Sequence, residues 1–331
     1  MALFRTDSSN SLGRYLRQNS IVFVFFCFVI FAIAVSSGRF IHPSNLINIL
    51  FQTSVVGVLA LGETLVMLTG GIDLSIVATT VVTAIIIGGA GSEQQQQMSM
   101  SNALPYLGFW LSILVGIGGS FLIGLINGII IVRFRIPAFI ATLAMSLMLA
   151  GVALLLTGGA PIYYPDPFFA QFGQAKLLHI PYPVWTFVAL ALILAFLLSR
   201  SKIGLMVYAS GGNNRAARLS GIPVGSVTIL MYTLCGLMAG IGGFLFLART
   251  GSVAPDSGGS FLLTTIASVV VGGVSLAGGI GSIKNAVFGV LLLASLSNLL
   301  NILLISPHIQ DAVSGVIILV ALMVNARVNP A

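Results

Sequence analysis

The sequence predicts an all-α integral membrane protein with about ten transmembrane helices. Of its 331 residues, 57% are apolar and only 6% are charged, whereas a soluble domain is about 25% charged. Long apolar runs recur along the chain, and each is close to the roughly 20 residues that a helix needs to cross a bilayer. The basic residues fall singly or in pairs between these runs. Lipid is therefore the expected solvent for most of the chain.

The apolar runs, separated by turn and charge signals, give ten expected spans. Residues 1–19 are a polar, basic segment before them, residues 20–326 form the transmembrane domain, and residues 327–331 are a short tail. The spans are expected near 20–38, 46–70, 74–91, 106–132, 137–158, 183–199, 225–248, 261–281, 285–305 and 309–326. The eighth is dense in glycine, so either a full crossing or a re-entrant segment fits it.

The distribution of Lys and Arg predicts the orientation. With the N-terminus in the cytoplasm and the ten spans alternating, eleven of the 14 basic residues lie inside. Only Arg39, Lys176 and Arg249 fall outside. This asymmetry is the one that the positive-inside rule describes. The even number of spans also places the C-terminus in the cytoplasm.

The net charge of +7 and the absence of catalytic motifs exclude several function classes. The basic residues form no clustered patch, which argues against a nucleic-acid partner. No GxxxxGK is followed by Ser or Thr, and neither HExxH nor GxSxG occurs. Neither Cys27 nor Cys235 belongs to a metal-binding pattern. We therefore expect no catalytic residue, no metal site and no cofactor bound by this chain.

Four polar residues inside spans are candidates for a solute pathway. Glu63 is an acidic residue well within an apolar run, and at 100° per residue Gln52 lies about 20° from it around the helix. Asn298 and Asn301 form a similar pair on the ninth span. Intramembrane polar groups face the protein interior or water. Helix–helix hydrogen bonding is the simpler interpretation of each single residue, and both interpretations stay open.

The segment after the second span contains a predicted turn. Gly70 and Gly71 permit a sharp turn with positive φ. The Asp73 side chain can then accept hydrogen bonds from the first amides of the next helix. Direct contact of Asp73 with substrate or nucleotide is the alternative.

A polar segment between the sixth and seventh spans predicts a short cytoplasmic helix. Asn213 or Asn214 can cap it, residues 215–219 can form its body, and Gly221 and Pro223 can end it.

Four segments resemble the permease family of ribose-type ATP-binding-cassette importers. They are LGETLVMLTGGIDLS at 61–75, NGIIIVRFRIPAFIATL at 127–143, ASGGNNRAARLSGIPV at 209–224 and SVVVGGVSLAGGIG at 268–281. The resemblance implies a permease fold that moves a small sugar across the bacterial inner membrane by alternating access.

The resemblance also implies partners. It identifies 209–224 as the segment that docks into a separate cytoplasmic ATPase, which uses ATP and Mg²⁺. The implied coupling residues are Gly211, Gly212, Asn213, Asn214, Arg215, Ala217, Arg218, Leu219, Ser220 and Gly221. A periplasmic sugar-binding protein and a second permease chain, identical or homologous, would complete the transporter.

The chain departs from the family pattern in two places, and the cargo is therefore open. Ile76-Val77-Ala78 follows GGIDLS where the family usually has Val-Gly, and Leu262 and Thr264 stand where relatives often carry acidic residues. Ribose, another pentose, a hexose, a related furanose or a nucleoside all remain candidates. An ion-driven transporter, with Glu63 as its one candidate ion site, and a membrane scaffold or enzyme are the rival functions.

Overall fold

The computed structural model describes residues 20–93, 104–164, 167–259 and 261–306, with isolated residues beyond them. This part of the chain is mainly helical. Its longer helices are α2 (Ser20–Val35), α3 (Pro43–Leu68), α4 (Ile76–Gly91), α6 (Phe109–Phe134), α7 (Ala138–Thr157), α9 (Tyr182–Arg200), α12 (Val224–Thr250), α13 (Phe261–Val271) and α14 (Ile283–Ile302). The short elements are η2 (Arg39–Ile41), α8 (Pro167–Gln174), α10 (Lys202–Gly212), α11 (Asn214–Leu219), and strands β1 (Ile162–Tyr163), β2 (Lys176–Leu177), β3 (Ile180–Pro181) and β4 (Ser252–Val253).

Six of the described helices are long and apolar enough to cross a membrane: α3, α6, α7, α9, α12 and α14. Three shorter apolar helices, α2, α4 and α13, accompany them. All nine lie in regions where the sequence predicts spans. Only scattered residues of the expected tenth span, 309–326, are described, and the 1–19 segment and the 327–331 tail lie outside the described residues.

The eighth expected span, 261–281, does not form one continuous helix. α13 ends at Val271, and Gly273, Gly278, Gly279 and Gly281 then adopt positive φ, a conformation that interrupts a right-handed helix and that glycine adopts most readily. The chain returns through this loop to Ser282, whose side chain accepts a hydrogen bond from the Asn285 amide at the start of α14. This segment is therefore a half-helix followed by a partly buried loop.

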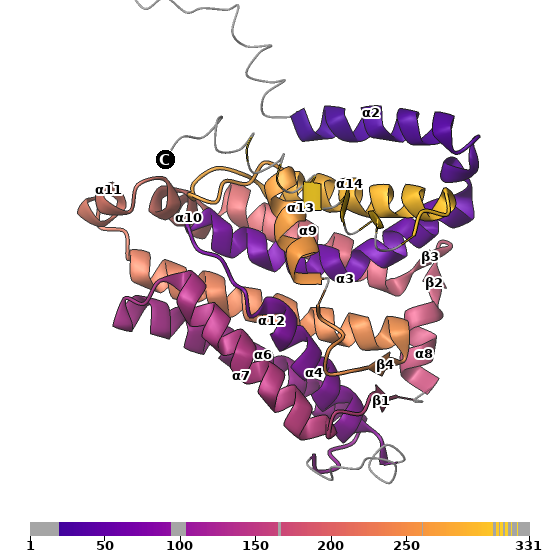
Figure 1. The fold of residues 1–331 in the computed structure, drawn as a ribbon. Coiled ribbons are helices and arrows are strands. Elements are labelled where there is room, and N and C mark those ends of the chain that lie inside the picture. Colours follow the sequence, from indigo (N-terminus) through magenta and orange to yellow (C-terminus); the bar gives the residue numbers. More distant parts are fainter. Residues whose placement is uncertain are drawn as a thin grey trace, which may run out of the picture.

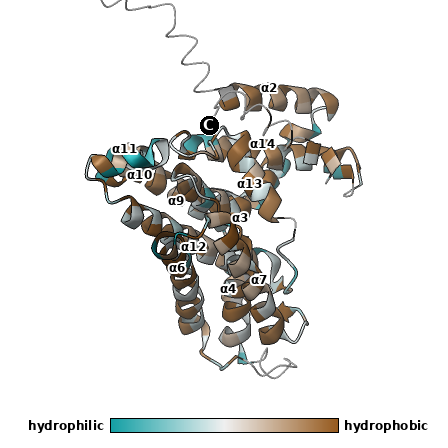
Figure 2. Cartoon of the chain, turned by 60° about the vertical axis from the view of Figure 1, so that its left-hand side comes forward, coloured by the Kyte–Doolittle hydropathy of each residue, from teal (hydrophilic) through white to brown (hydrophobic). Residues whose placement is uncertain are grey.

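The helices form a bundle with α3 and α12 at its centre. Most residues in the apolar stretches of both are buried, whereas only 28% of those in α6, α7 and α9 are buried. Figure 1 shows the long helices running between one end, which carries α10 and α11, and an opposite end, which carries α8 and the short strands. Figure 2 shows that hydrophobic residues predominate along the helices, and many large apolar side chains of α6, α7 and α9 are exposed, as expected of surfaces that contact lipid.

Glycines permit a close crossing of α6 and α12. A Cβ on Gly236 of α12 would lie 2.9 Å from the Gly124 Cα of α6, with the Ser120 carbonyl oxygen nearer still. Small residues at such crossings let membrane helices approach closely enough for extensive van der Waals contact.

The end that carries the strands is closed by paired backbone and aromatic side chains. Ile162 pairs with Val253 and Tyr163 with Ser252 in an antiparallel ladder between β1 and β4. Within α8, Phe169 packs edge-on against Phe109, and Phe172 packs against Phe244. The described part of the segment between α7 and α9 is therefore rich in aromatic contacts and contains the short helix α8.

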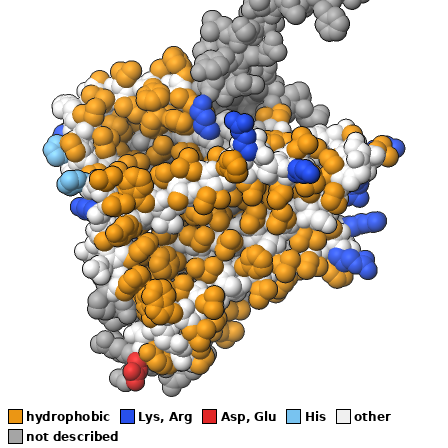
Figure 3. Space-filling view, turned by 180° about the vertical axis from the view of Figure 1, so that it is seen from behind, with side chains coloured by type: hydrophobic (Ala, Val, Ile, Leu, Met, Phe, Trp, Pro, Cys, Tyr) orange, Lys and Arg blue, Asp and Glu red, His pale blue; other side chains and the backbone are white. Residues whose placement is uncertain are grey.

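The opposite end is basic. In Figure 3 the Lys and Arg side chains gather mainly at the end that carries α10 and α11, and an orange apolar surface covers the middle of the molecule. Arg133, Arg200 and Lys202 lie at helix ends on this side. In the described structure the basic residues therefore lie at one end of the helices, and the apolar surface surrounds their middle.

Candidate functional site

The buried turn between α3 and α4 is the first feature of the candidate site. α3 ends at Leu68, and residues 69–75 connect it to α4; Asp73 and Ser75 of this segment are buried, whereas Gly70 is exposed. Gly70 adopts φ +79°. Non-helical backbone at membrane depth is tolerated where protein surrounds it or where it lines a water-filled cavity, so the polar groups of this turn need partners from neighbouring helices.

A buried hydrogen-bond network supplies those partners. Glu63 Oε1 accepts a hydrogen bond from the Asp73 backbone N–H at 3.1 Å. Asp73 Oδ1 accepts from the Ser75 backbone N–H at 2.9 Å and from the Ser75 hydroxyl at 2.6 Å. Asn127 of α6 donates from Nδ2 to Ser75 Oγ at 2.8 Å. Asp73 thus accepts hydrogen bonds at the N-terminus of α4, and Glu63 supports the turn from α3.

Two further helices hold the same turn. The Tyr232 hydroxyl of α12 and the Thr142 hydroxyl of α7 both donate to the Ile72 carbonyl oxygen, at 3.2 Å and 3.3 Å. Four helices (α3, α6, α7 and α12) therefore contact one turn through side chains. In an apolar environment each unmade hydrogen bond would be costly, so this arrangement fixes the turn. Two oxygens of the network, Glu63 Oε2 and Asn127 Oδ1, are buried without a partner among the described residues.

The structure does not bring Gln52 and Glu63 into one site. Gln52 is exposed and donates to Asn48 at 3.2 Å, whereas Glu63 is buried in the network of the α3–α4 turn. The eleven-residue separation along α3 places them in different environments, although they share a helical face.

The two asparagines of α14 also have different surroundings. Asn298 is buried and exchanges two side-chain hydrogen bonds with Asn45 of α3, each 2.9 Å long. Asn301 is exposed and accepts from Gln310 at 2.8 Å. Asn298 therefore makes a helix–helix contact in this structure, and Asn301 remains accessible.

Two glycine-rich loops and α10 meet in a tight junction next to the α3–α4 turn. The Gly279 N–H donates to the Leu68 carbonyl at 3.0 Å. A Cβ on Gly278 would lie 2.8 Å from the Gly70 nitrogen and 3.0 Å from the Gly211 Cα. We call Gly70, Gly211, Gly278 and Gly279 the glycine junction. It joins the ends of α3 and α10 to the loop that follows α13.

Tyr208 attaches α10 to the same loop. Its hydroxyl donates to the Gly281 carbonyl at 3.0 Å, and burial raises the pKa of the phenol. α10 is thereby fixed at its end to the loop that follows α13.

The short helix α11 follows directly from the junction. Asn213 is its N-cap, and the Asn213 side chain accepts from the Ala216 N–H at 2.9 Å. Arg218 donates to the Asn214 side chain at 2.8 Å, and the Leu219 side chain is 83% exposed. Gly221, with φ +81°, follows the helix. The predicted short helix is present, and it presents two arginines and an unburied leucine to the surroundings.

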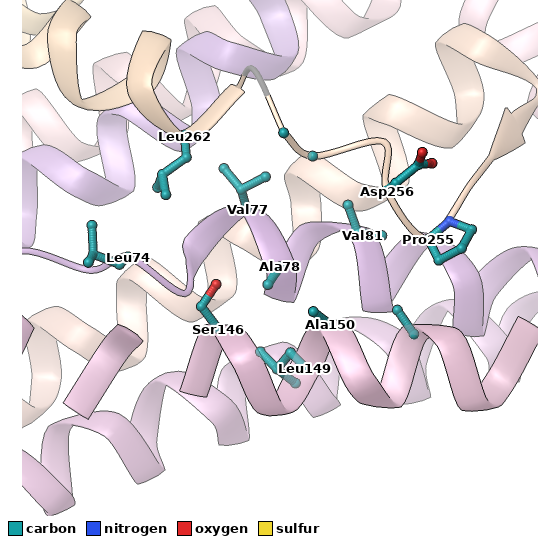
Figure 4. A pocket seen from close by; sticks show the side chains of 13 residues that line it. Leu74, Val77, Ala78, Val81, Ser146, Leu149, Ala150, Pro255, Asp256 and Leu262 are labelled. Carbon is teal, nitrogen blue, oxygen red and sulfur yellow. The ribbon is translucent and has the colours of Figure 1, made fainter. Parts of the chain in front are cut away.

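A cavity of about 280 Å³ lies between α4, α7 and the segment that precedes α13. Figure 4 shows Leu74 and Asp256 at opposite ends of this cavity, and the Ser146 hydroxyl points from α7 toward α4. Of thirteen lining residues, only Ser146 and Asp256 have polar side chains; the others are Leu74, Val77, Ala78, Val81, Leu149, Ala150, Ala153, Pro255, Gly258, Gly259 and Leu262. The cavity is therefore apolar with two polar positions.

The sequence gives weak signals for four residues that the structure brings into these sites. Asn127 is an isolated amide in an apolar span, and Tyr232 is an isolated phenol in another. Ser146 and Asp256 carry no spacing pattern. Their importance depends on which helices are neighbours, and intramembrane polarity was the only available signal.

In comparisons with known proteins, a family model and individual relatives are both permeases of transport systems. A family model described as "Branched-chain amino acid transport system / permease component" matches residues 45–322. The ribose import permease RbsC of Escherichia coli (strain K12) is 38% identical over 299 residues, which are 88% of each chain.

Two further relatives are similar over an even larger share of the chain. RbsC of Bacillus subtilis (strain 168) is 36% identical over 301 residues, 90% of each chain. The L-arabinose transport system permease AraH of Escherichia coli (strain K12) is 33% identical over 316 residues, covering 96% of this chain and 92% of that relative. No solved structure matches the chain.

Proposed function

This chain belongs to the family of transport-system permease components, and from that premise we propose that it is the membrane permease of an ATP-binding-cassette importer for a small sugar. The observation that carries the proposal is the similarity, over most of the chain, to permeases for ribose and L-arabinose. The family description names branched-chain amino acids, but these individual relatives are sugar permeases. A pentose, or a sugar of similar size, is therefore the proposed cargo.

The proposed topology has about ten spans with both termini in the cytoplasm of a bacterium, in its inner membrane. The gathering of basic side chains at the α10–α11 end supports this orientation (Figure 3), because Lys and Arg are retained on the cytoplasmic side. The end with α8 and the short strands would then face the periplasm, where a sugar-binding protein would deliver the cargo.

The proposed contact with the ATPase is the segment 209–224, with α11 at its tip. Arg215 and Arg218 supply charge to a partner groove, and the exposed Leu219 supplies an apolar anchor. The N-cap at Asn213 stabilises the helix against fraying, as Asn caps generally do. A rigid helix is needed because the ATPase must transmit a rigid-body movement to the spans.

The glycine junction gives this movement a direct route. Gly211 of α10 lies two residues before Asn213, and it contacts the Leu68 carbonyl at the end of α3. Displacement of α11 would therefore act on the α3–α4 turn without an intervening flexible loop. ATP and Mg²⁺ are used by the partner ATPase in this proposal, and a second permease chain completes the membrane part.

The four polar candidates divide into two groups under this proposal. Gln52 and Asn301 are exposed, so they remain candidates for contact with passing sugar. Glu63 and Asn298 have partners within the protein, so they are proposed to act mainly by holding helices in place.

Reversal of charge on α11 tests the proposal. We expect R215E/R218E to lower co-purification with the cognate ATPase, and to lower ATP-dependent uptake of radiolabelled D-ribose into vesicles in parallel, because both arginines lie on the exposed helix. K202E is the matched control: Lys202 is also exposed at this end of the molecule, but it lies at the start of α10, and its reversal should leave association intact.

Two outcomes would contradict the proposal. Unchanged ATPase association and uptake in R215E/R218E would remove the coupling role of α11. Sugar accumulation by vesicles that contain the permease alone, abolished by an uncoupler and independent of ATP, would instead establish the ion-driven alternative.

A further inference from the structure

The cavity between α4 and α7 has the position expected of a resting site for solute. One end is lined by Asp256, which lies three residues after β4 at the strand-bearing end of the molecule. The other end is lined by Leu74, the residue between Asp73 and Ser75 of the buried turn. The cavity therefore lies between the segment that follows β4 and the turn that the glycine junction contacts.

The two sides of the cavity differ in backbone structure. Helices α4 and α7 form one side, and the non-helical segment 255–259 with Leu262 of α13 forms the other. Non-helical backbone within a membrane protein either is enclosed by protein or lines a water-filled cavity. The first turn of a helix also leaves backbone N–H groups without intrahelical acceptors, and Leu262 lies in that turn.

The two polar side chains in the lining are available to a ligand. Asp256 is exposed, and no described residue forms a hydrogen bond or an ion pair with its carboxylate. Ser146 likewise makes no side-chain hydrogen bond with a described residue. Thr142, one turn earlier on α7, shares its hydroxyl proton between the Ala138 carbonyl oxygen at 2.8 Å and the Ile72 carbonyl oxygen at 3.3 Å. A carboxylate and a hydroxyl are suitable partners for sugar hydroxyls.

The remaining lining limits which sugar fits. Leu74, Val77, Val81, Leu149 and Leu262 present only hydrocarbon, and the volume of about 280 Å³ is at the lower limit of small-molecule pockets. Each sugar hydroxyl that enters without a hydrogen-bond partner raises the free energy of binding. A ligand with hydroxyls on one edge and hydrocarbon on the other therefore loses the least binding free energy on entering the cavity.

We infer that this cavity is the sugar-binding site of the permease, and that it selects small sugars with an apolar edge, such as deoxy or methyl-bearing pentoses and hexoses, over fully hydroxylated ones. The inference rests on the proposed function and adds a site and a substrate class to it. Asp256 and Ser146 bind the hydroxylated edge, and the aliphatic side chains of α4 and α7 contact the apolar edge.

Cysteine protection tests the site on the purified full-length permease. Cys27 is exposed and Cys235 is buried, so C27S provides a background of low labelling. A78C then places a thiol in the cavity lining, and its rate of reaction with a maleimide is measured with 5-deoxy-D-ribose or with D-ribose. These probes differ by one hydroxyl. A150C, also in the lining, is the second reporter, and S220C beside α11 is the control.

We expect both sugars to slow labelling of A78C and neither to slow labelling of S220C. The deoxy sugar should protect at a concentration about tenfold lower, because one unpaired hydroxyl is removed from the apolar wall. D256N should raise the protecting concentration of both sugars several-fold. Equal protection by D-ribose would overturn the selectivity, and absence of protection at both reporters would overturn the site.

The same preparations separate this inference from the proposed function. Protection that persists while the permease neither binds an ATPase nor supports ATP-dependent uptake would retain the cavity and overturn the proposed function. ATP-dependent uptake without protection at either reporter would retain the proposed function and exclude the cavity.

Discussion

The backbone N–H of Gly279 donates to the carbonyl oxygen of Leu68 across 3.0 Å, although 211 residues separate them in the chain. Leu68 is the last residue of α3, and Gly279 belongs to the loop after α13. The Leu68 carbonyl is among the last four of α3 and therefore has no N–H partner within its own helix, so this bond supplies one. Two interrupted parts of the bundle are thereby joined beside α10, which leads into α11.

The first prediction concerns neighbouring glycines of α10. A Cβ on Gly211 would collide with the Leu68 carbonyl oxygen and would approach the Gly279 nitrogen to 2.5 Å, whereas a Cβ on Gly212 would meet nothing within 4 Å. We expect G211A to lower the thermal unfolding temperature of the detergent-purified permease and to reduce ATP-dependent uptake, because backbone must move to admit the methyl group. The cost of such overpacking is about 1–3 kcal/mol.

G212A is the matched control, since it adds the same methyl group one residue later. It should unfold at nearly the wild-type temperature and retain uptake. Equal effects of G211A and G212A would show that helix propensity, and not the close contact, determines the result.

The second prediction concerns Glu63 and the turn it supports. E63A removes the acceptor of the Asp73 N–H and leaves a void in a buried site. An unsatisfied buried donor costs about 1–3 kcal/mol, and we expect a correspondingly lower unfolding temperature. E63Q keeps the shape and an acceptor oxygen, so it should be distinctly more stable than E63A.

Comparison of E63A with E63Q also distinguishes a structural role of Glu63 from a role as an ion-binding site. If the carboxylate acted as an ion site, E63Q would abolish uptake as completely as E63A while remaining folded. We expect uptake by E63Q to be largely preserved, as measured in vesicles with the ATPase present.

The third prediction compares the two asparagines of α14. N298A breaks the reciprocal pair with Asn45 and leaves that amide without its partner. Interhelical hydrogen bonds in membranes contribute about 0.6 kcal/mol on average and up to about 1.7 kcal/mol, so a modest fall in unfolding temperature is expected. N301A, at an exposed position on the same helix, should leave the unfolding temperature unchanged.

A double-mutant cycle with N45A checks the reason for this difference. The effects of N298A and N45A should be less than additive, because each removes the same pair of bonds. Full additivity would mean that the two amides do not depend on each other.

Much of the helical framework could be predicted from composition and apolar run length. The expected spans 183–199 and 225–248 correspond to Tyr182–Arg200 and Val224–Thr250 in the structure, because a sufficiently long apolar segment in lipid must satisfy its backbone internally as a helix. The short helix at 214–219 was also predictable, since an Asn cap and a following glycine are local signals.

The end of α13 was not predictable in the same way. Residues 261–281 carry no charge and are mostly apolar or glycine, so their composition permits a full span. The loop after Val271 exists because its glycines approach α3 and α10, and those neighbours are distant in sequence. The candidate site had the same limitation: the resemblance identified the 61–75 and 209–224 segments, but not their meeting at the glycine junction.

By itself, the sequence determined the membrane as solvent, the positions of most helices, the basic end of the bundle and the capped helix α11. These properties depend on local hydropathy, charge and capping, which act over one or two helical turns. Only the tertiary structure decided that Glu63 supports Asp73, that Asn298 pairs with Asn45, and that Ser146 and Asp256 share a cavity. Those relationships depend on which helix faces pack together, and in an almost uniformly apolar chain small residues and scattered polar groups determine that packing over long sequence separations.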